Sequence, residues 1–285
     1  MLAASPKIAY ISEPLNLLHR PGVFGAKVSF WYTYICNENE SDYLPAFHEL
    51  LNYRYHLFAE VRSLRSRKDF LRMGRDLSIF WRAALFHQYP LLKDPFAVFS
   101  LPWFAKRLNS RIIVTIRHPA AFASSLKRLN WSFDFNDLLD QPLLMRDHLE
   151  AYRKDMRSVA GDDIIGQASL LWTMVYRIVH AACDQIPSIR VVRHEDLSLD
   201  PVAGYRQLYA ELGLNFTPEV ERRILDSSSS ENPAELSHNK VHSVKLDSRS
   251  NLDNWKHRLS SSEITSIRRE AEEVAHLYYP EVDWN

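Results

Sequence analysis

A short apolar run that ends in a charged turn constrains this chain more than any other feature. Ile112-Ile113-Val114-Thr115-Ile116 stops at Arg117-His118-Pro119, and a serine pair follows at Ser124-Ser125. A short β-branched run bounded by charge predicts a buried parallel strand that is apolar on both faces. Pro119 suits the first turn of a helix, where its missing N–H costs nothing. We therefore expect a strand, a tight turn and a helix within an open α/β sheet.

Arg117 would lie at the carboxyl end of this strand, where open α/β sheets bind their ligands. Ser125, two helical turns further along, would lie near the same strand end. A guanidinium and a hydroxyl at the start of a helix suit a phosphate dianion. Lys127 and Arg128 either add to such a site or face water. An ordinary strand-to-helix turn with a surface arginine explains the same pattern.

The turn resembles part of a known family. Arg117-His118-Pro119, with a serine eight residues after the arginine, resembles the 3′-phosphate-binding segment of sulfotransferases that use 3′-phosphoadenylyl sulfate (PAPS). Lys93-Asp94-Pro95-Phe96 resembles a segment of the tyrosylprotein sulfotransferases and their bacterial relatives. The likeness runs from about Ile8 to the C-terminus. It implies an α/β fold of P-loop type, with a parallel sheet flanked by helices, in which residues 1–285 form a single sulfotransferase-like domain.

The resemblance also implies a reaction and roles for named residues. The reaction is in-line transfer of a sulfuryl group from PAPS, as co-substrate, to a hydroxyl or amine, leaving adenosine 3′,5′-bisphosphate. Arg117 and Ser125 would hold the 3′-phosphate. Glu13, after the expected strand Ile8–Ser12, matches the family's catalytic base, and Lys93 would stabilise the leaving phosphate. Two alternatives stay open: Glu13 as a helix-terminal or surface ion-pair carboxylate, and Lys93 paired with Asp94 or a nearby carboxylate.

Two further segments resemble nucleotide contacts of the family. His194-Glu195-Asp196-Leu197 resembles a Tyr-Glu-Asp-Leu segment whose tyrosine lies near the adenine, so His194 is the candidate adenine contact. The polar stretch from Ser227 to Asn251 resembles a lid that the family closes over the 3′-phosphate. Its candidate phosphate contacts are Ser243, Lys245, Ser248 and Arg249. A disordered basic loop is the alternative interpretation of that stretch.

One part of the family pattern is absent from the sequence. In the family, the strand matching Ile8–Ser12 follows a first strand and a glycine-containing loop that cradles the 5′-phosphosulfate. The sequence has seven glycines, none followed by Lys-Ser, Lys-Thr or Thr. Gly22 to Lys27 has the wrong spacing and reads as an ordinary loop. We expect either an enzyme whose natural chain begins upstream of Met1, or a truncated, catalytically inactive nucleotide-binding or interaction protein of the same fold.

The remaining pattern is mostly helical. Apolar spacing predicts helices over residues 44–66, 77–85, 140–159, 163–186 and 201–214, a strand over 189–193, and a final helix after the capping-box spacing of Ser260 and Glu263. A basic segment from Arg62 to Arg75 either attracts an acidic acceptor or forms a solvated helix face. The aromatic segment Phe30 to Tyr34, expected as a strand or a helix start, either lines the acceptor pocket or belongs to the core.

Composition limits the partners and the compartment. The formal net charge is zero, so no global field favours nucleic acid or an anionic membrane. Only two cysteines are present, and the first residues lack signal-peptide character, which together favour a soluble cytoplasmic protein without a membrane span. The closest histidine pair, His238 and His242, has no cysteine or carboxylate cluster around it, so we expect no metal. The expected acceptor is a small molecule, a peptide or a carbohydrate. A metal-dependent kinase is disfavoured, because no Gly-Lys-Ser or Gly-Lys-Thr occurs.

Overall fold

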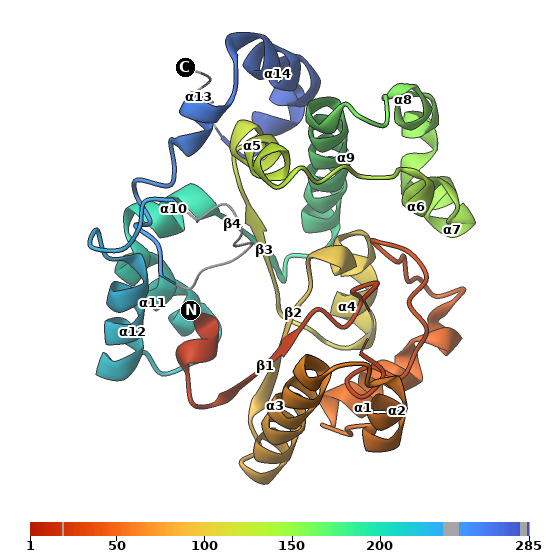
Figure 1. The fold of residues 1–285 in the computed structure, drawn as a ribbon, viewed down its shortest axis with the longest axis vertical. Helices are drawn as coiled ribbons and strands as arrows, with labels where there is room; N and C mark the ends of the chain where they lie inside the picture. Colours follow the sequence, from red (N-terminus) through yellow and green to blue (C-terminus); the bar gives the residue numbers. More distant parts are fainter. Residues whose placement is uncertain (19, 236–244, 280–283, 285) are drawn as a thin grey trace. The chain divides into compact units, whose positions relative to one another are not determined.

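Two pairs of short parallel strands organise the chain. The computed structural model describes residues 1–18, 20–235, 245–279 and 284. Strand β1 (Ile8–Ser12) pairs with β2 (Tyr89–Lys93), and β3 (Ile112–Ile116) pairs with β4 (Ile189–Arg193). Parallel strands need a crossover connection, and helices supply it in both pairs. The fold is therefore α/β, with parallel strands flanked by helices, as the sequence predicted (Figure 1).

The chain divides into two compact units. We name residues 2–103 the N-terminal unit, and Met1 with residues 104–285 the C-terminal unit. Each pair of parallel strands belongs to one of these units. The expectation that residues 1–285 form one sulfotransferase-like domain stays a prediction.

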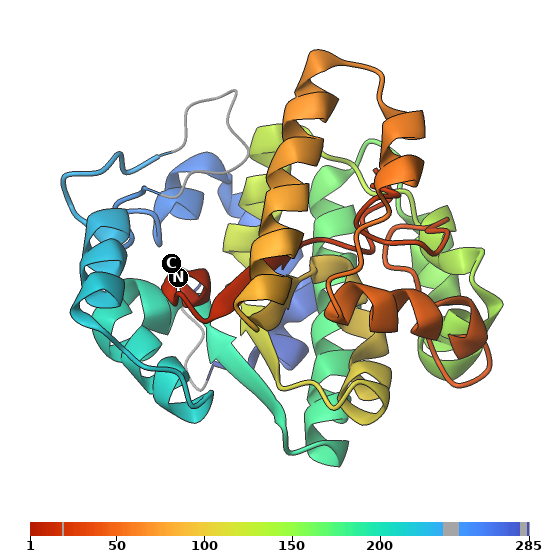
Figure 2. The ribbon, with the colours of Figure 1, turned by 90° about the horizontal axis from the view of Figure 1, so that it is seen from below.

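The long helix α3 (Arg67–Leu85) packs against β1 in the N-terminal unit (Figure 2). It begins where the side chain of Ser66 accepts a hydrogen bond from the backbone N–H of Asp69 at 3.2 Å. Such a cap contributes about 1 kcal/mol to helix stability. The other elements that begin in this unit are η1 (Leu2–Ala4), η2 (Glu40–Asp42), α1 (Leu44–Leu51), α2 (Leu57–Ser63), η3 (Pro95–Ser100) and α4 (Leu101–Arg107).

Two predictions for this unit were wrong in detail. The helix expected over 44–66 is two helices, because the chain turns between them at Tyr53, whose φ of 58° is left-handed. The aromatic segment Phe30 to Tyr34 forms neither strand nor helix. Instead, Trp31 and Tyr32 pack on Phe96 of η3, with ring centroids 4.6 and 5.5 Å away. The loop from Gly22 to Lys27 is confirmed as irregular.

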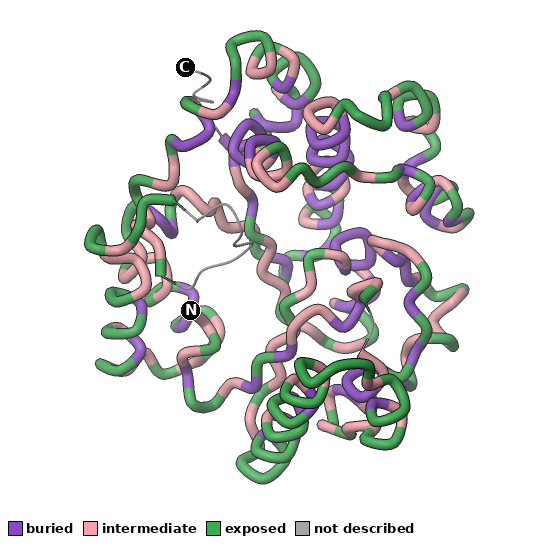
Figure 3. Tube along the Cα trace, viewed as in Figure 1, coloured by how far each residue is buried: buried purple, intermediate pink, exposed green. Residues whose placement is uncertain are grey.

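Helix α9 (Ile164–Gln185) organises the C-terminal unit by packing against α5 (Pro119–Leu129) and α14 (Ser261–Ala275). Ile116, Trp172, Trp255 and Ile267 lie in the core that these elements share. Figure 3 shows stretches of α5 and α9 as buried. The other helices of the unit are α6 (Asn136–Leu139), α7 (Pro142–Leu144), η4 (Met145–Leu149), η5 (Glu150–Tyr152), α8 (Arg153–Ser158), α10 (His194–Leu199), α11 (Pro201–Glu211), α12 (Pro218–Ser228) and α13 (Asn254–Arg258).

The elements of the C-terminal unit agree with the sequence predictions in part. The capping box of Ser260 and Glu263 and the left-handed stop at Gly213 are confirmed. The helix expected over 140–159 is a series of short α, π and 3-10 segments. Strand β3 is less buried than expected: Ile116 is fully buried, whereas Thr115 is exposed. Among the described residues, β3 has a strand neighbour on one edge only, which leaves its other residues partly accessible.

Among the residues that the structure describes, every helix is too short or too polar to span a lipid bilayer.

Candidate functional site

The predicted site residues fall into two groups. Glu13 and Lys93 belong to the N-terminal unit, and the candidate nucleotide contacts belong to the C-terminal unit. Ser243, His238 and His242 lie outside the described residues. The described residues include no group of three or more histidine, cysteine or acidic side chains that could hold a metal ion.

Glu13 and Lys93 form an ion pair at the carboxyl ends of β1 and β2. The register places Ser12 opposite Lys93, so Glu13 follows immediately at the same sheet edge. The backbone N–H of Glu13 donates to the carbonyl of Lys93 at 2.7 Å. The second carboxylate oxygen accepts a hydrogen bond from Asn16 Nδ2 at 2.7 Å. Lys93 therefore pairs with Glu13, the nearby carboxylate that the sequence left as an alternative.

The backbone of Glu13 is strained. Its φ of 52° lies in the left-handed region, which residues with a Cβ adopt at a cost. Such strain of about 1–3 kcal/mol is concentrated at active sites and ligand clamps. The carboxylate is only 22% exposed, while the Lys93 side chain is 44% exposed. The arrangement fixes a carboxylate beside an ammonium group, which suits proton acceptance next to stabilisation of an anionic leaving group.

Asp94 anchors the chain behind this pair. Its carboxylate accepts hydrogen bonds from the backbone N–H groups of Leu15 at 2.6 Å and Phe96 at 3.0 Å. Burial raises the pKa of Asp94 to about 6, although these two hydrogen bonds favour the ionised form. Asp94 thus ties the segment after Glu13 to the segment after Lys93.

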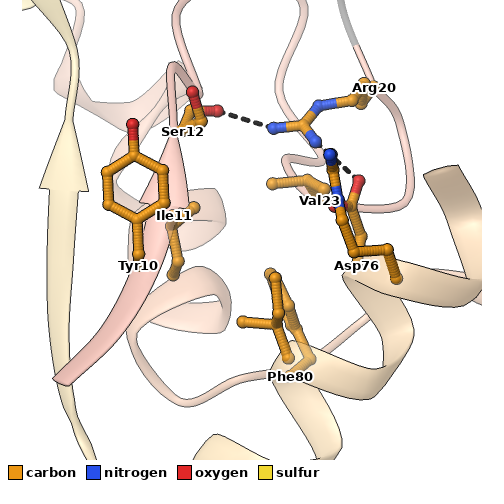
Figure 4. A pocket seen from close by; sticks show the side chains of 9 residues that line it. Tyr10, Ile11, Ser12, Arg20, Val23, Asp76 and Phe80 are labelled. Atoms are coloured by element: carbon orange, nitrogen blue, oxygen red, sulfur yellow. Dashed lines mark hydrogen bonds and ion pairs between the residues drawn. The ribbon is translucent and has the colours of Figure 1, made fainter. Parts of the chain in front are cut away.

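A hollow of about 250 Å³ lies between β1 and α3 (Figure 4). Arg20 crosses it, donating to the carbonyl of Ser12 at 2.6 Å and to the carboxylate of buried Asp76 at 2.5 Å. Tyr10, Ile11 and Ser12 of β1 line the hollow on the strand side, and Asp76 and Phe80 line it on the helix side. A hydroxyl-rich ligand would find donors and acceptors here, one residue before Glu13.

In the C-terminal unit, Arg117 and Ser125 meet as predicted. Arg117 Nη1 donates to Ser125 Oγ at 3.2 Å, and that hydroxyl donates to the carbonyl of Ala121 at 2.9 Å. Trp172 Nε1 donates to the Arg117 carbonyl at 2.9 Å, which fixes the backbone of the turn. Because His118 caps α5 through Nδ1, accepting from the Ala120 N–H at 3.3 Å, the turn leads directly into the helix. The guanidinium and the hydroxyl are therefore held together by the fold.

Glu195 braces the same turn. Its carboxylate accepts hydrogen bonds from the His118 N–H at 2.8 Å and from the Tyr279 hydroxyl at 3.0 Å. The register pairs Ile116 with Arg193, which brings the residues after β3 and β4 to one edge. From the sequence, Glu195 was part of the His194-Glu195-Asp196-Leu197 motif and had no predicted role. The signal that could have found it is its position two residues after the strand Ile189–Arg193, comparable to that of Arg117 after Ile112–Ile116.

Two further arginines lie close enough to affect Arg117. Burial lowers the pKa of Arg117, the charge of Glu195 opposes this effect, and the charges of Arg258 and Arg128 add to it. Arg128 Nη1 is buried without a hydrogen-bond partner among the described residues. Arg258, at the end of α13, was not predicted; it also pairs with Glu235 at 2.9 Å. Lys127 instead pairs with Glu263 at 2.6 Å.

The charges around Arg117 suit an anion. Arg128 and Arg258 act on the Arg117 guanidinium as like charges, and Glu195 is the opposing carboxylate. Like charges at close range repel, and a bound dianion would remove that repulsion. The unpartnered Nη1 of Arg128 fits the same conclusion, because a buried donor without an acceptor is costly.

Of the other predicted nucleotide contacts, His194 begins α10, and Ser248 and Arg249 bind to that helix from another segment. Burial, with the charge of Arg117 as a second cause, lowers the pKa of His194 to about 4, so the imidazole is neutral at pH 7. Ser248 and Arg249 bind the other end of the helix: Ser248 Oγ donates to the Ser198 carbonyl at 2.8 Å, and Arg249 Nη2 donates to the Leu199 carbonyl at 2.8 Å. Their assignment to the nucleotide stays a prediction. Lys245 is exposed.

Comparison with known proteins identifies relatives of this chain. A family model described as "Sulfotransferase family" matches residues 25–218, about two thirds of the chain. Carbohydrate sulfotransferase 5 of Homo sapiens is 28% identical over 188 residues, which cover 63% of this chain and 39% of that protein. Carbohydrate sulfotransferase 5 of Mus musculus is 26% identical over 185 residues, 63% of this chain and 41% of that protein. The chain thus spans about two fifths of the length of these relatives.

A solved structure titled "Sulfotransferase Domain from the Curacin Biosynthetic Pathway" aligns with 82% of this chain and 80% of its own chain. The TM-score is 0.43 and the sequence identity is 18%.

Proposed function

Because the chain belongs to the sulfotransferase family, we propose that it transfers a sulfuryl group from PAPS to a hydroxyl or amine acceptor, releasing adenosine 3′,5′-bisphosphate. One observation carries the proposal: the fold holds Arg117 against Ser125, with Arg128 and Arg258 close enough to act on Arg117. That arrangement suits the 3′-phosphate, the group that distinguishes PAPS from ordinary adenine nucleotides.

Arg117 and Ser125 provide different parts of this binding. A guanidinium offers several N–H donors in a planar fork that matches phosphate oxygens. The Ser125 hydroxyl donates to the Ala121 carbonyl here, and it turns its single O–H toward a phosphate oxygen when the ligand binds, because a phosphate dianion only accepts hydrogen bonds. Arg128, with a buried unpartnered Nη1, supplies a further donor. His194, neutral and partly buried, is the proposed contact for the adenine ring.

Glu13 and Lys93 account for the chemistry at the acceptor. As the acceptor oxygen forms its bond to sulfur, Glu13 accepts the proton from that oxygen. The bond between sulfur and the bridging oxygen breaks at the same time, and the electron pair stays on the departing phosphate. Lys93 stabilises this developing negative charge. The ion pair with Lys93 holds the Glu13 carboxylate at this strand end.

We further propose a carbohydrate hydroxyl as the acceptor. The two curated relatives are carbohydrate sulfotransferases by name. The hollow beside β1 supports this choice, because the polar residues Tyr10, Ser12 and Arg20 are among those that line it. These groups can bond to several hydroxyls of one sugar. We place the reaction in the cytoplasm, where Cys36 and Cys183, both free thiols in the structure, would stay reduced.

Conversion of PAPS tests the proposal. We expect adenosine 3′,5′-bisphosphate to accumulate, by chromatography, when the protein is given PAPS and a hydroxylated carbohydrate, and to do so equally with a chelator present. A requirement for magnesium would instead indicate phosphoryl transfer. Binding of adenosine 3′,5′-bisphosphate without any turnover would leave only the nucleotide-binding alternative.

A further inference from the structure

Large apolar side chains are exposed along α3 of the N-terminal unit. Phe70, Trp81 and Leu85 are 61%, 66% and 53% exposed, and Leu71 and Leu77 are exposed as well. Figure 3 shows most of this helix as exposed. In soluble proteins a contiguous apolar patch on the surface marks an interaction site. Trp131, by contrast, is exposed in the C-terminal unit within a non-helical segment.

The exposed apolar residues of α3 form one stripe. Phe70, Gly74, Leu77, Trp81 and Leu85 follow one another at intervals of three or four residues, so they lie on one side of the helix. A Cβ added at Gly74 would meet nothing within 4 Å, so the stripe is open there too. The core of the unit uses a different side of α3, formed by Met73, Phe80 and Ala83. The exposed stripe is therefore additional to what the fold needs.

A row of basic side chains runs beside the stripe. Lys68, Arg75 and Arg82 recur every seven residues and are exposed. One member of this row is neutralised, because Arg75 pairs with Asp76 at 3.1 Å. The Asp69 carboxylate accepts a hydrogen bond from the capping Ser66 hydroxyl at 2.9 Å and pairs with Arg72. Lys68 and Arg82 therefore carry the positive charge of this surface. The open surface of α3 is thus apolar on one flank and positively charged on the other.

We propose that α3 docks the protein onto an anionic lipid bilayer. A helix with Trp, Phe and Leu on one flank and Lys and Arg on the other lies in the interface between headgroups and acyl chains. Phe70, Trp81 and Leu85 enter the acyl boundary, and the basic row meets the anionic headgroups. This docking goes beyond sulfuryl transfer and requires no membrane-spanning helix.

The charge pattern decides between lipid and other occupants. A second copy of α3 would bring its own basic row to this surface, and like charges would oppose the pairing. An acidic polysaccharide would satisfy Lys68 and Arg82 but would leave Phe70 and Trp81 in water. An anionic bilayer satisfies the charged row and the apolar stripe together.

Vesicle flotation tests the proposal. The full chain is expected to float with vesicles of phosphatidylcholine containing phosphatidylserine, and far less with phosphatidylcholine alone. Each basic residue at an anionic surface contributes about a fivefold gain in binding. Lys68→Glu combined with Arg82→Glu should therefore weaken partitioning by more than about 25-fold. Phe70→Ser combined with Trp81→Ser should also abolish flotation, and Trp131→Ser, a matched exposed tryptophan in the C-terminal unit, should not.

Fluorescence quenching locates the contact. Brominated lipids in the same vesicles should quench tryptophan emission of the wild type and of Trp131→Phe, and should quench Trp81→Phe much less. Three results would overturn the proposal, provided that circular dichroism shows a folded chain. The first is that the chain does not float with anionic vesicles, and the second is that quenching does not depend on Trp81. The third is that the chain forms a dimer without lipid and that the double variant Phe70→Ser, Trp81→Ser dissociates this dimer. If the chain does not float but binds soluble heparin, and this binding needs the basic row and not Trp81, the occupant is a polysaccharide instead.

Discussion

Arg117 donates a hydrogen bond to Ser125 at 3.2 Å across the turn that joins β3 to α5. The two residues are eight positions apart, and the bond exists because the helix starts directly after the strand. Ser125 receives this bond while donating to Ala121. The two side chains are thus held next to each other without a ligand.

Ser125→Ala should weaken the binding of adenosine 3′,5′-bisphosphate by about threefold to tenfold. A hydrogen bond to a charged phosphate contributes about 1.5–3 kcal/mol, and part of it is offset because the hydroxyl gives up its bond to the Ala121 carbonyl. Ser124→Ala is the matched control, since the Ser124 hydroxyl is buried without a hydrogen-bond partner among the described residues. Titration calorimetry of both variants measures the difference. Equal affinities would remove Ser125 from the phosphate site.

Glu195→Ala should lower the free energy of unfolding by about 2–3 kcal/mol, because it leaves the buried backbone N–H of His118 and the Tyr279 hydroxyl without their acceptor. Asp196→Ala, which removes only an exposed ion pair with Arg193, should cost less than about 1 kcal/mol. Denaturant unfolding monitored by circular dichroism compares the two. Similar losses would mean that Glu195 does not brace the turn.

Asp94 should make stability depend on pH. Burial raises its pKa from 3.8 to about 6, so the folded chain binds the proton more tightly than the unfolded chain does. This contribution to stability is complete below about pH 4 and is lost as the pH rises through 6. We expect it to change the free energy of unfolding by about 2 kcal/mol between pH 4 and 7.

Asp94→Asn should remove this component. The free energy of unfolding is measured for the wild type and the variant at pH 4.5 and at pH 7. The change between the two pH values is then compared between the proteins, so that titrating groups present in both cancel. Asp253→Asn, at a side chain that is 69% exposed, is the control and should behave like the wild type. A variant with the wild-type pH dependence would show that Asp94 does not titrate in this range.

Glu13→Gln should lower the turnover of PAPS with a carbohydrate acceptor by about 10²–10⁴-fold, the usual contribution of a general base. Nucleotide affinity should stay the same, and stability should change by less than about 1 kcal/mol because the ion pair with Lys93 is partly exposed. Glu211→Gln, in an exposed ion pair with Arg190, is the control. Product formation at saturating PAPS measures the effect, and wild-type turnover in Glu13→Gln would exclude it as the base.

The Arg117 turn was predictable because local rules determine it. A β-branched run ends at a charge, Pro119 starts a helix, and the eight-residue spacing then brings Ser125 back to the strand end. Glu13 and Lys93 were predictable as strand-end residues, but their ion pair depends on the register of β1 with β2. A single sequence does not encode that register in any local pattern.

Residues that act through long-range packing could not be predicted in the same way. Arg258 reaches the neighbourhood of Arg117 from a helix far along the chain, and Tyr279 reaches Glu195 from beyond α14. The break at Tyr53 was also missed, because the apolar spacing continues across it while the backbone turns. The spacing of apolar residues indicates which side of a helix is buried, but it does not locate the residue at which a helix is interrupted.

The most direct test is calorimetric titration of the full chain with adenosine 3′,5′-bisphosphate, for the wild type, Arg117→Ala and the exposed control Arg222→Ala. A hydrogen bond to a charged group contributes about 1.5–3 kcal/mol, so Arg117→Ala should bind about tenfold to a hundredfold more weakly, and Arg222→Ala should match the wild type. Unchanged affinity in folded Arg117→Ala, or no binding by the folded wild type, would contradict the assignment of this turn to the nucleotide phosphate.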